Sequence, residues 1–253
     1  MNKQTRRSFL KTSLYTGATV AWTAKSWGQV KGANETLRCA TVGFRSRGGS
    51  HISSITGMQK REQGVKLTAL CDVDKKVLDA GAAKHKVKGY QDIREMLEKE
   101  DLDVVTVATP NHWHTLAAIW AIQAGKDVYV EKPVSHNVWE GRQLVNAARK
   151  YKKIVQTGTQ ARSSKCIQDA VKWVQAGNLG KIKVSRGLCY KSRPSIGDID
   201  GSKAVPSEID YNLWLGPAPK RTFSRAHFHG SWHKYWAYSG GDMADCGVHQ
   251  LDI

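Results

Sequence analysis

No segment of the sequence stays apolar for long. None reaches the run of roughly 18 uncharged apolar residues that a membrane-spanning helix needs. Hydrophobic residues make up 40% of the chain and charged residues 24%, which is ordinary for a globular protein. We therefore expect no stable membrane anchor. A chain of 253 residues is long enough for one large domain or two smaller ones.

Paired cysteines of the C-x-x-C type are also missing. The chain has five cysteines, an odd number, and no two of them are separated by only two residues. Cys39 and Cys71 fall in apolar segments that are typical of buried strands. We expect both to be small buried hydrophobic residues, and we expect no disulfide framework in a chain of this size.

Acidic residues are too few to balance the basic ones, and the formal net charge is +17. Residues 1–33 contain six Lys or Arg and no acid. In the rest of the chain the basic residues are scattered and often stand beside acids, as in the segment Asp92–Glu95. No basic helix, RNA-binding signature or zinc finger is present. The charge therefore predicts a solvated basic surface and no nucleic-acid partner.

The amino terminus has the pattern of an export signal. Thr5-Arg-Arg-Ser-Phe-Leu-Lys11 resembles the twin-arginine (Tat) motif, and a modest apolar stretch over residues 14–22 follows it. The alternative is a disordered basic tail. We expect residues 1–33 to engage the Tat export machinery, with cleavage between Ala24 and Ala33, and the protein to be periplasmic or otherwise exported. The Tat route carries folded proteins, which suits a protein that acquires its cofactor before export.

Strand-like and helix-like segments alternate from residue 37 to residue 157. Short apolar runs predict strands at 37–43, 65–72, 104–108, 127–131 and 154–157. Helical patterns fill the gaps, at 51–60, 73–84, 92–98, 114–124 and 138–151. This order predicts an α/β fold with a doubly wound parallel sheet, the Rossmann fold, over residues 34–158. Ligands of such sheets bind beyond the carboxyl ends of the strands.

The pattern changes after Gly158. A helix is predicted at 166–176 and a strand at 181–188, whereas residues 191–241 are rich in Trp, Tyr, His, Gly and Pro. That composition favours loops over a binding site, and irregular structure packed by aromatic rings is the alternative. We therefore expect residues 159–253 to form an α+β second domain.

The first strand-turn-helix unit carries most of a dinucleotide-binding loop. Gly43-Phe-Arg-Ser-Arg-Gly48 has the first and third glycines of G-x-G-x-x-G, but Arg45 stands where the second glycine is expected. The amino terminus of the following helix would still offer N–H groups to a pyrophosphate. Arg45 or Arg47 could neutralise the phosphate charge directly.

Asp72 ends the second predicted strand, 24 positions after Gly48. A carboxylate there can accept hydrogen bonds from ribose hydroxyls and would repel a 2′-phosphate. This favours NAD over NADP, although Lys75 and Lys76 leave NADP open. The alternative role for Asp72 is that of a helix cap.

Three further motifs follow in a fixed order. They are Ala108-Thr-Pro-Asn-His-Trp-His114, Glu131-Lys-Pro133, and the Asp245-Cys-Gly-Val-His249 stretch within residues 240–252. Together they resemble the Gfo/Idh/MocA family, which includes glucose–fructose oxidoreductase and inositol dehydrogenase. Residues 158–162 and 211–219 are also similar to segments of that family. The resemblance covers about residues 37–253.

The resemblance implies roles for individual residues. Lys132 would lie near the nicotinamide and the reacting oxygen, His249 would be the general acid/base, and Asp245 would orient His249 or contact a hydroxyl group. The implied cofactor contacts are Gly43, Arg45, Arg47, Gly48, Asp72, Thr109, Pro110, Asn111, His114, Glu131 and Lys132. The implied substrate contacts are Gln160, Arg162, Trp236, Asp245 and His249.

Two histidine groups invite a metal interpretation, namely His112 with His114, and His227 with His229 and His233. The resemblance accounts for the first pair by cofactor and substrate contacts. The second group stands among Trp232, Tyr235 and Trp236, which is similar to a sugar-stacking surface. We therefore predict no bound metal.

The implied activity is reversible hydride transfer between NAD and a sugar- or cyclitol-like secondary alcohol or ketone. We expect the full-length protein to be a homo-oligomer. One alternative is a glycoside hydrolase or lyase that recycles its NAD internally. A non-catalytic dinucleotide- or sugar-binding protein is another, because Arg45 alters the loop. The chain ends at Ile253, where the family continues into an open antiparallel sheet, so we expect the second domain to be truncated.

Overall fold

The computed structural model describes residues 36–190, 195, 202–224 and 228–253. Residues 37–253 form a compact unit of their own, distinct from residues 1–36. The predicted export signal therefore lies outside the described residues and stays a prediction. In the described part of the chain, every helix is too short or too polar to cross a membrane.

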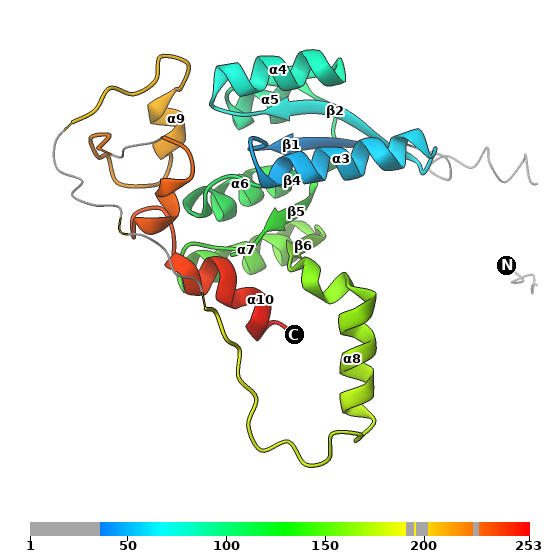
Figure 1. Cartoon of the computed structure of the whole chain (residues 1–253). Coiled ribbons are helices and arrows are strands. Elements are labelled where there is room, and N and C mark those ends of the chain that lie inside the picture. Colours follow the sequence, from blue (N-terminus) through cyan, green and yellow to red (C-terminus); the bar gives the residue numbers. More distant parts are fainter. Residues whose placement is uncertain (1–35, 191–194, 196–201, 225–227) are drawn as a thin grey trace, which may run out of the picture. The chain divides into compact units, whose positions relative to one another are not determined.

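Six parallel strands form a single sheet (Figure 1). They are β1 (Leu37–Val42), β2 (Val65–Cys71), β3 (Lys88–Tyr90), β4 (Val104–Val107), β5 (Asp127–Glu131) and β6 (Val155–Gly158). Their order is β3-β2-β1-β4-β5-β6, so the chain reverses its winding direction between β1 and β4. This confirms the predicted doubly wound sheet and places its ligand-binding crevice at that reversal. Strand β3 was not predicted, because three residues carry no recognisable apolar run.

Five helices connect these strands. They are α3 (Arg47–Lys60), α4 (Lys75–His85), α5 (Ile93–Lys99), α6 (Asn111–Gln123) and α7 (Val138–Tyr151). The side chains of Asp74, Asp92 and Asn137 each accept a hydrogen bond from a first-turn N–H group, which fixes where α4, α5 and α7 begin. Helix α3 begins earlier than predicted, at Arg47, so the last two residues of the glycine loop, Arg47 and Gly48, are already helical.

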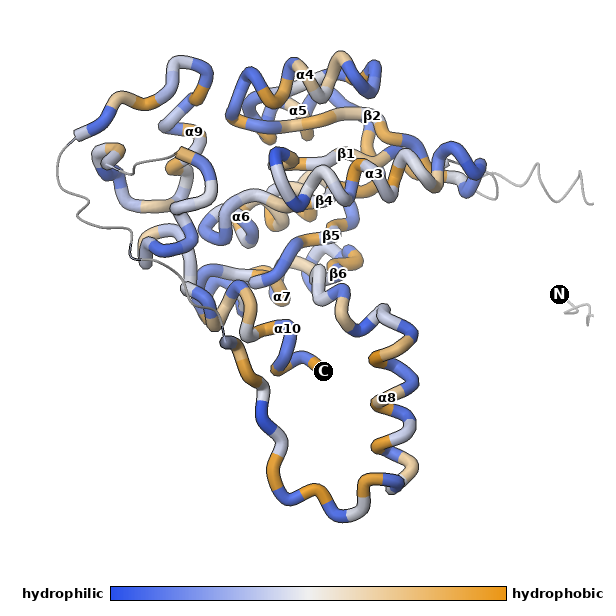
Figure 2. The backbone as a smooth tube through the Cα atoms, viewed as in Figure 1, coloured by the Kyte–Doolittle hydropathy of each residue, from blue (hydrophilic) through white to orange (hydrophobic). Residues whose placement is uncertain are grey.

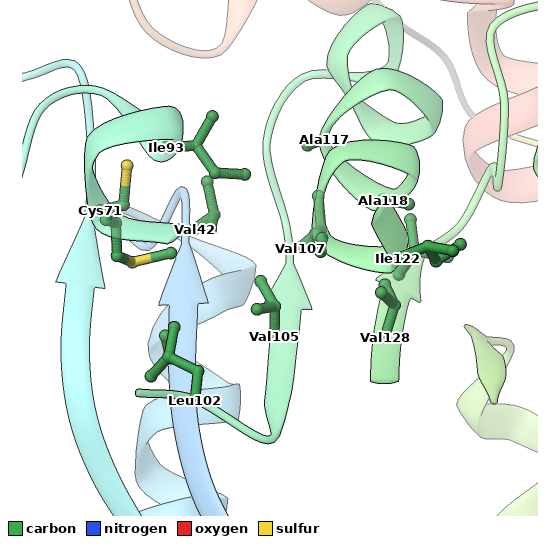
Figure 3. Close-up of a cluster of buried hydrophobic side chains, with 14 of the residues drawn as sticks. Val42, Cys71, Ile93, Leu102, Val105, Val107, Ala117, Ala118, Ile122 and Val128 are labelled. Carbon is green, nitrogen blue, oxygen red and sulfur yellow. The ribbon is translucent and has the colours of Figure 1, made fainter. Parts of the chain in front are cut away.

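Both faces of the sheet are buried. On β2, Leu67 and Leu70 pack beneath α3 and α4, whereas Ala69 and Cys71 face α5 and α6. A register shift against β1, between Cys39 and Ala40, interrupts the strict alternation of the strand and lets Leu67 and Leu70 share one face. Figure 3 shows the second of these clusters, in which strand valines meet the small side chains of α6. Cys39 and Cys71 are buried as predicted, and burial raises the pKa of the Cys39 thiol to about 11.

Residues beyond β6 form short helices and loops. These elements are the 3₁₀ turns η1 (Gln160–Ser163) and η2 (Ser231–Lys234), the helices α8 (Lys165–Gln175), α9 (Tyr211–Leu215) and α10 (Val248–Leu251), and the π-helix η3 (Met243–Gly247). A separate aromatic cluster that includes Trp214, Phe228 and Tyr238 packs part of this region. The Trp214 carbonyl accepts hydrogen bonds from the side chains of His112 and Trp113, which ties the cluster to α6.

The strand predicted at residues 181–188 is wrong. This stretch has no regular structure, and Ile182, Val184 and Leu188 are exposed. In Figure 2 it is the tube after α8, where hydrophobic and hydrophilic residues alternate. The alternation suits a strand, but a strand is stable only with a neighbour that completes its hydrogen bonds. Among the described residues no strand lies beside it.

Candidate active site

A cavity of about 650 Å³ opens at the carboxyl ends of the strands. Its volume is within the range of small-molecule and cofactor sites, about 300–1,000 Å³. Most of the predicted site residues line it, namely Gly43, Arg45, Arg47, Asp72, Thr109, Pro110, Asn111, His114, Glu131, Lys132, Gln160, Asp245 and His249. Residues from the β1–β6 region and residues beyond β6 thus line the same cavity.

Two predicted substrate contacts lie elsewhere. Trp236 is 85% exposed and is not part of the cavity wall. Arg162 is also outside the wall, and its Nε donates to Oδ2 of Asp252 at 2.6 Å. Both residues belong to loop or 3₁₀ segments, whose side-chain directions follow from no sequence periodicity.

The turn after β1 explains its two glycines. Gly43 has a φ of +73°, and a side chain there would meet the main chain of Thr109 at 2.9 Å. A side chain at Gly48 would stand 2.1 Å from the carbonyl oxygen of Gly43, so this glycine lets α3 start directly against the turn. Arg45, which replaces the middle glycine, is exposed and lines the cavity. Its guanidinium is therefore available to a phosphate group.

Asp72 is buried at the end of β2 and does not cap a helix. Its Oδ2 accepts a hydrogen bond from the N–H of Phe44 at 3.0 Å, and its Oδ1 accepts one from the N–H of Asp74 at 3.1 Å. Burial raises the pKa of Asp72 above its ordinary value, and these two hydrogen bonds offset only part of that rise. The carboxylate holds the glycine turn against β2, and each oxygen keeps a second acceptor position for a ribose hydroxyl group.

Glu131 links the end of β5 to the first turn of α3. Its Oε1 accepts hydrogen bonds from Nε of Arg47 at 2.9 Å and from Nε2 of His51 at 2.8 Å. Burial alone would raise the pKa of Glu131, but these two partners lower it below its ordinary value. Gly158 on β6 makes room, because a side chain there would stand 2.9 Å from the Glu131 carboxyl carbon. The E-K-P segment is thereby attached to the predicted phosphate turn.

Lys132 lines the cavity and contacts η3, which lies beyond β6. Its Nζ donates to the main-chain oxygen of Asp245 at 2.5 Å and lies 3.9 Å from Oδ1 of the same residue. Asp245 is in the π-helix η3, a rare geometry that often occurs at functional sites. The Lys132–Pro133 peptide bond is cis. The ammonium group is thus held at a defined point of the cavity wall.

Asp245 has a second tie, to the turn after β4. Nδ2 of Asn111 donates to Oδ1 of Asp245 at 3.2 Å and to Oγ of Ser239 at 3.0 Å. Asn111 and Ser239 are both almost fully buried. The amide of Asn111 therefore orients the Asp245 carboxylate, and the cofactor contact that the resemblance implied for Asn111, which also lines the cavity, stays a prediction.

His249, four residues after Asp245, also lines the cavity. Burial lowers the pKa of His249, and the positive charge of Lys132 lowers it further. A neutral imidazole can accept a proton, which is the property that a general base requires. The hydrogen bonds of Asp245 reach Asn111 and Lys132, so the expected pairing of Asp245 with His249 stays a prediction.

Sequence analysis missed three polar residues at this site. His51 and Ser239 have no motif of their own, and their partners Glu131 and Asn111 are 80 and 128 positions away. The third is Asp74, whose Oδ2 lies 2.9 Å from Nε2 of His229. His227, which the sequence grouped with His229 and His233, lies outside the described residues. Among those described, no three His, Cys, Asp or Glu side chains gather as a metal site would require.

The cavity fits a dinucleotide. Its wall joins a glycine turn, a helix amino terminus and an acidic strand end in the order that pyrophosphate and ribose require. Three wall residues have a buried polar atom without a hydrogen-bond partner in the described part of the chain. These atoms are Oγ1 of Thr109, Oε2 of Glu131 and Nδ1 of His249. Such unpaired atoms are costly unless a ligand satisfies them.

Comparison with known protein families matches both parts of the chain to one family. Residues 37–159 match the Gfo/Idh/MocA oxidoreductase family with its NAD-binding Rossmann fold, and residues 163–253 match the C-terminal alpha/beta domain of that family. The chain belongs to the Gfo/Idh/MocA family. The resemblance inferred from the motifs is thus confirmed, and the first domain is an NAD-binding one.

Three Gfo/Idh/MocA-like proteins illustrate the range of similarity. A glycosyl hydrolase family 109 protein from Solibacter usitatus is 34% identical over 167 residues, which are 58% of this chain and 37% of that protein. The structure of myo-inositol 2-dehydrogenase from Lactobacillus plantarum is 28% identical with a TM-score of 0.55, and the match covers 58% of this chain and 43% of that one. The WlbA dehydrogenase from Bordetella pertussis, in complex with NADH and UDP-GlcNAcA, is 25% identical with a TM-score of 0.54, covering 58% and 44%. The matched region therefore covers less than half the length of each of these three relatives.

Proposed function

We propose that the protein is an NAD-dependent oxidoreductase that transfers hydride to or from a sugar- or cyclitol-like secondary alcohol or ketone. One observation carries the proposal: Nζ of Lys132 is fixed against the Asp245 carbonyl in the same cavity that begins at the Gly43 turn. A cation at that point can stabilise negative charge on a reacting oxygen. The dehydrogenase relatives support the same chemistry.

The side chains divide the work as follows. Nicotinamide, when bound, supplies the carbon that accepts or releases hydride. In alcohol oxidation the neutral His249 imidazole takes the hydroxyl proton while the Lys132 ammonium stabilises the oxygen. Asn111 and Asp245 hold that ammonium in place. Asp72 carries negative charge where a 2′-phosphate would lie, which favours NAD over NADP.

The test uses the full chain with NAD⁺ and a panel of polyols, cyclitols and sugar acids, followed by NADH absorbance. We expect turnover on at least one of them and a loss of about 10²–10⁴-fold in the Lys132→Ala variant. Lys60→Ala is the matched control, since Lys60 is exposed at the far end of α3. Denaturing the purified protein should also release NAD(H), which mass spectrometry would detect. A protein that contains no dinucleotide and cannot be saturated with one would contradict the proposal.

The glycosyl hydrolase relative favours one alternative, glycoside cleavage in which NAD⁺ is reduced by taking a hydride from the sugar and is oxidised again by returning it within the same cycle. It would use the same residues. Chromogenic aryl glycosides distinguish the two, because cleavage without net NADH formation would establish the alternative. A non-catalytic binding protein would bind NADH equally well with Lys132 or Ala and turn over nothing.

We further propose that the twin-arginine segment directs export through the Tat machinery and that the mature protein is a homo-oligomer. Replacing Arg6 and Arg7 by Lys in a reporter fusion should leave the protein in the cytoplasm. Light scattering on the purified protein checks the oligomeric state.

A further inference from the structure

His114 occupies an unusual place between two parts of the cavity wall. It lies in the first turn of α6 and is 1% exposed. Its Nδ1 is 2.6 Å from the main-chain oxygen of Pro133, and its Nε2 is 2.8 Å from the main-chain oxygen of Thr109. Thr109 follows β4 and Pro133 follows β5, so a single imidazole ring bridges the turns after two neighbouring strands.

The chemistry of this bridge restricts how the turns can move. A carbonyl oxygen only accepts hydrogen bonds, and a neutral imidazole has one N–H. Burial lowers the pKa of His114, as does the Lys132 ammonium, whereas the two carbonyls and Glu131 raise it. The neutral ring donates a hydrogen bond to one oxygen and turns its unprotonated nitrogen toward the other, which is an unfavourable contact between two acceptors, whereas the protonated ring donates to both oxygens. In either state the ring sets the separation of the two oxygens.

We propose that His114 is a positioning residue for Lys132: by bridging the main-chain oxygens of Thr109 and Pro133 it fixes the E-K-P turn, and with it the Lys132 ammonium, relative to the turn after β4. This inference rests on the proposed function, in which Lys132 contacts the reacting oxygen. It gives His114 a role distinct from direct contact with the cofactor, because both of its ring nitrogens face the protein main chain.

Lys132 is sensitive to such a shift for two reasons. It immediately precedes Pro133, whose carbonyl the ring holds. Its Nζ meets a single main-chain oxygen, that of Asp245, at 2.5 Å, so a displacement of the turn away from Asp245 weakens this contact. A displacement of about 1 Å at a catalytic group can cost about 100-fold in rate.

His112 provides a matched control on the same helix. It is as buried as His114, and its Nε2 lies 3.0 Å from the Trp214 carbonyl. It is absent from the cavity wall and contacts neither of the two turns through its ring nitrogens in the described structure. Replacing it removes a buried imidazole of the same kind without touching the bridge.

The experiment compares His114→Gln, His114→Phe and His112→Gln in the full chain. The first readout needs no substrate: the rate at which trinitrobenzenesulfonate modifies Lys132, measured by peptide mass spectrometry. We expect Lys132 to react about fivefold faster in both His114 variants, because its contact with Asp245 is loosened. His112→Gln should react like the wild type. Glutamine keeps one donor, so His114→Gln tests the bridge even if the phenylalanine variant does not fold.

The second readout separates positioning from general packing. With NADH as probe, the dissociation constant should change by less than about threefold in His114→Gln, while kcat falls about 10- to 100-fold. Unchanged Lys132 reactivity in both His114 variants, or an equal change in His112→Gln, would overturn the proposal. A parallel loss of NADH affinity and kcat would also do so. If the wild type turns over no substrate, the proposed function fails, and the labelling rates still decide the role of His114.

Discussion

Arg47 and Glu131, 84 positions apart in the sequence, meet in an ion pair in which Nε of Arg47 lies 2.9 Å from Oε1 of Glu131. The Glu131 carboxylate is buried, whereas the Arg47 side chain is 42% exposed. Arg47 opens α3 and Glu131 closes β5, so the pair fastens the phosphate turn to the residue before Lys132. His51 donates to the same oxygen at 2.8 Å. The position of Lys132, the proposed catalytic lysine, is therefore linked to the first turn of α3.

Replacing Glu131 by Gln should destabilise the fold in a pH-dependent way. The variant loses a charged acceptor that serves two donors, and we expect a cost of about 1–3 kcal/mol at pH 7 in urea denaturation. The pKa of Glu131 is below its ordinary value of 4.5 in the folded protein. Its contribution to stability is therefore complete above pH 4.5 and is lost as the pH falls through the lower folded pKa. The gap between wild type and variant should shrink over that range.

Glu98→Gln serves as the control for this measurement, because Glu98 is exposed on α5. We expect its unfolding free energy to stay within about 0.5 kcal/mol of the wild type at each pH. A gap between wild type and Glu131→Gln that stays constant down to pH 3 would contradict the ion-pair interpretation.

Much of the Rossmann domain follows from local sequence. Strand β5 and helix α7 have the predicted bounds, because one is a short apolar run and the other is an amphipathic segment with Asn137 as its cap. The cavity wall was also predictable, since parallel strands bring their carboxyl ends to one edge of the sheet. The links within the wall were not. His51 meets Glu131, and Ser239 meets Asn111, only through tertiary packing, which leaves no local pattern. The failed strand at 181–188 has the same cause, because alternation describes a strand but not its partner.

Gly48 should tolerate no side chain. In Gly48→Ala the new methyl group would stand 2.1 Å from the carbonyl oxygen of Gly43, so either α3 or the turn must move. We expect a loss of about 1–3 kcal/mol in stability and at least about tenfold in NADH affinity, measured by fluorescence titration.

The adjacent Gly49 provides the control. In Gly49→Ala the methyl group would lie 3.5 Å from the Phe44 carbonyl oxygen, an ordinary contact inside α3. Alanine favours a helix over glycine by about 0.5–1 kcal/mol, so this variant should be as stable as the wild type or more so. Equal NADH affinities for the two variants would contradict the close packing of turn and helix.

Arg45 should compensate electrostatically for the missing second glycine. Replacing it by Gln removes one positive charge beside the predicted pyrophosphate position. We expect the dissociation constant for NADH to rise about 3- to 10-fold at low ionic strength and the difference to narrow at 0.5 M salt, because screening weakens exposed charge interactions. Lys60→Gln, at the other end of α3, should bind NADH like the wild type. An Arg45→Gln effect that is equally large at high salt would instead indicate a steric role for the arginine.

The pKa of His249 should be coupled to the charge of Lys132. Burial lowers this pKa below its ordinary value of 6.5, and the ammonium lowers it further. In Lys132→Met the ammonium is removed while the side chain keeps much of its length, so we expect the His249 pKa to rise toward 6.5 without reaching it, since burial remains. Titration by NMR measures the change, with His249→Asn to assign the signal and Lys60→Met as the control. In wild-type alcohol oxidation, where the base must be neutral, kcat/KM should fall at low pH with a midpoint below pH 6.5. A His249 pKa that is the same with Lys132 and Met would mean that the two groups are too far apart to act on one substrate oxygen.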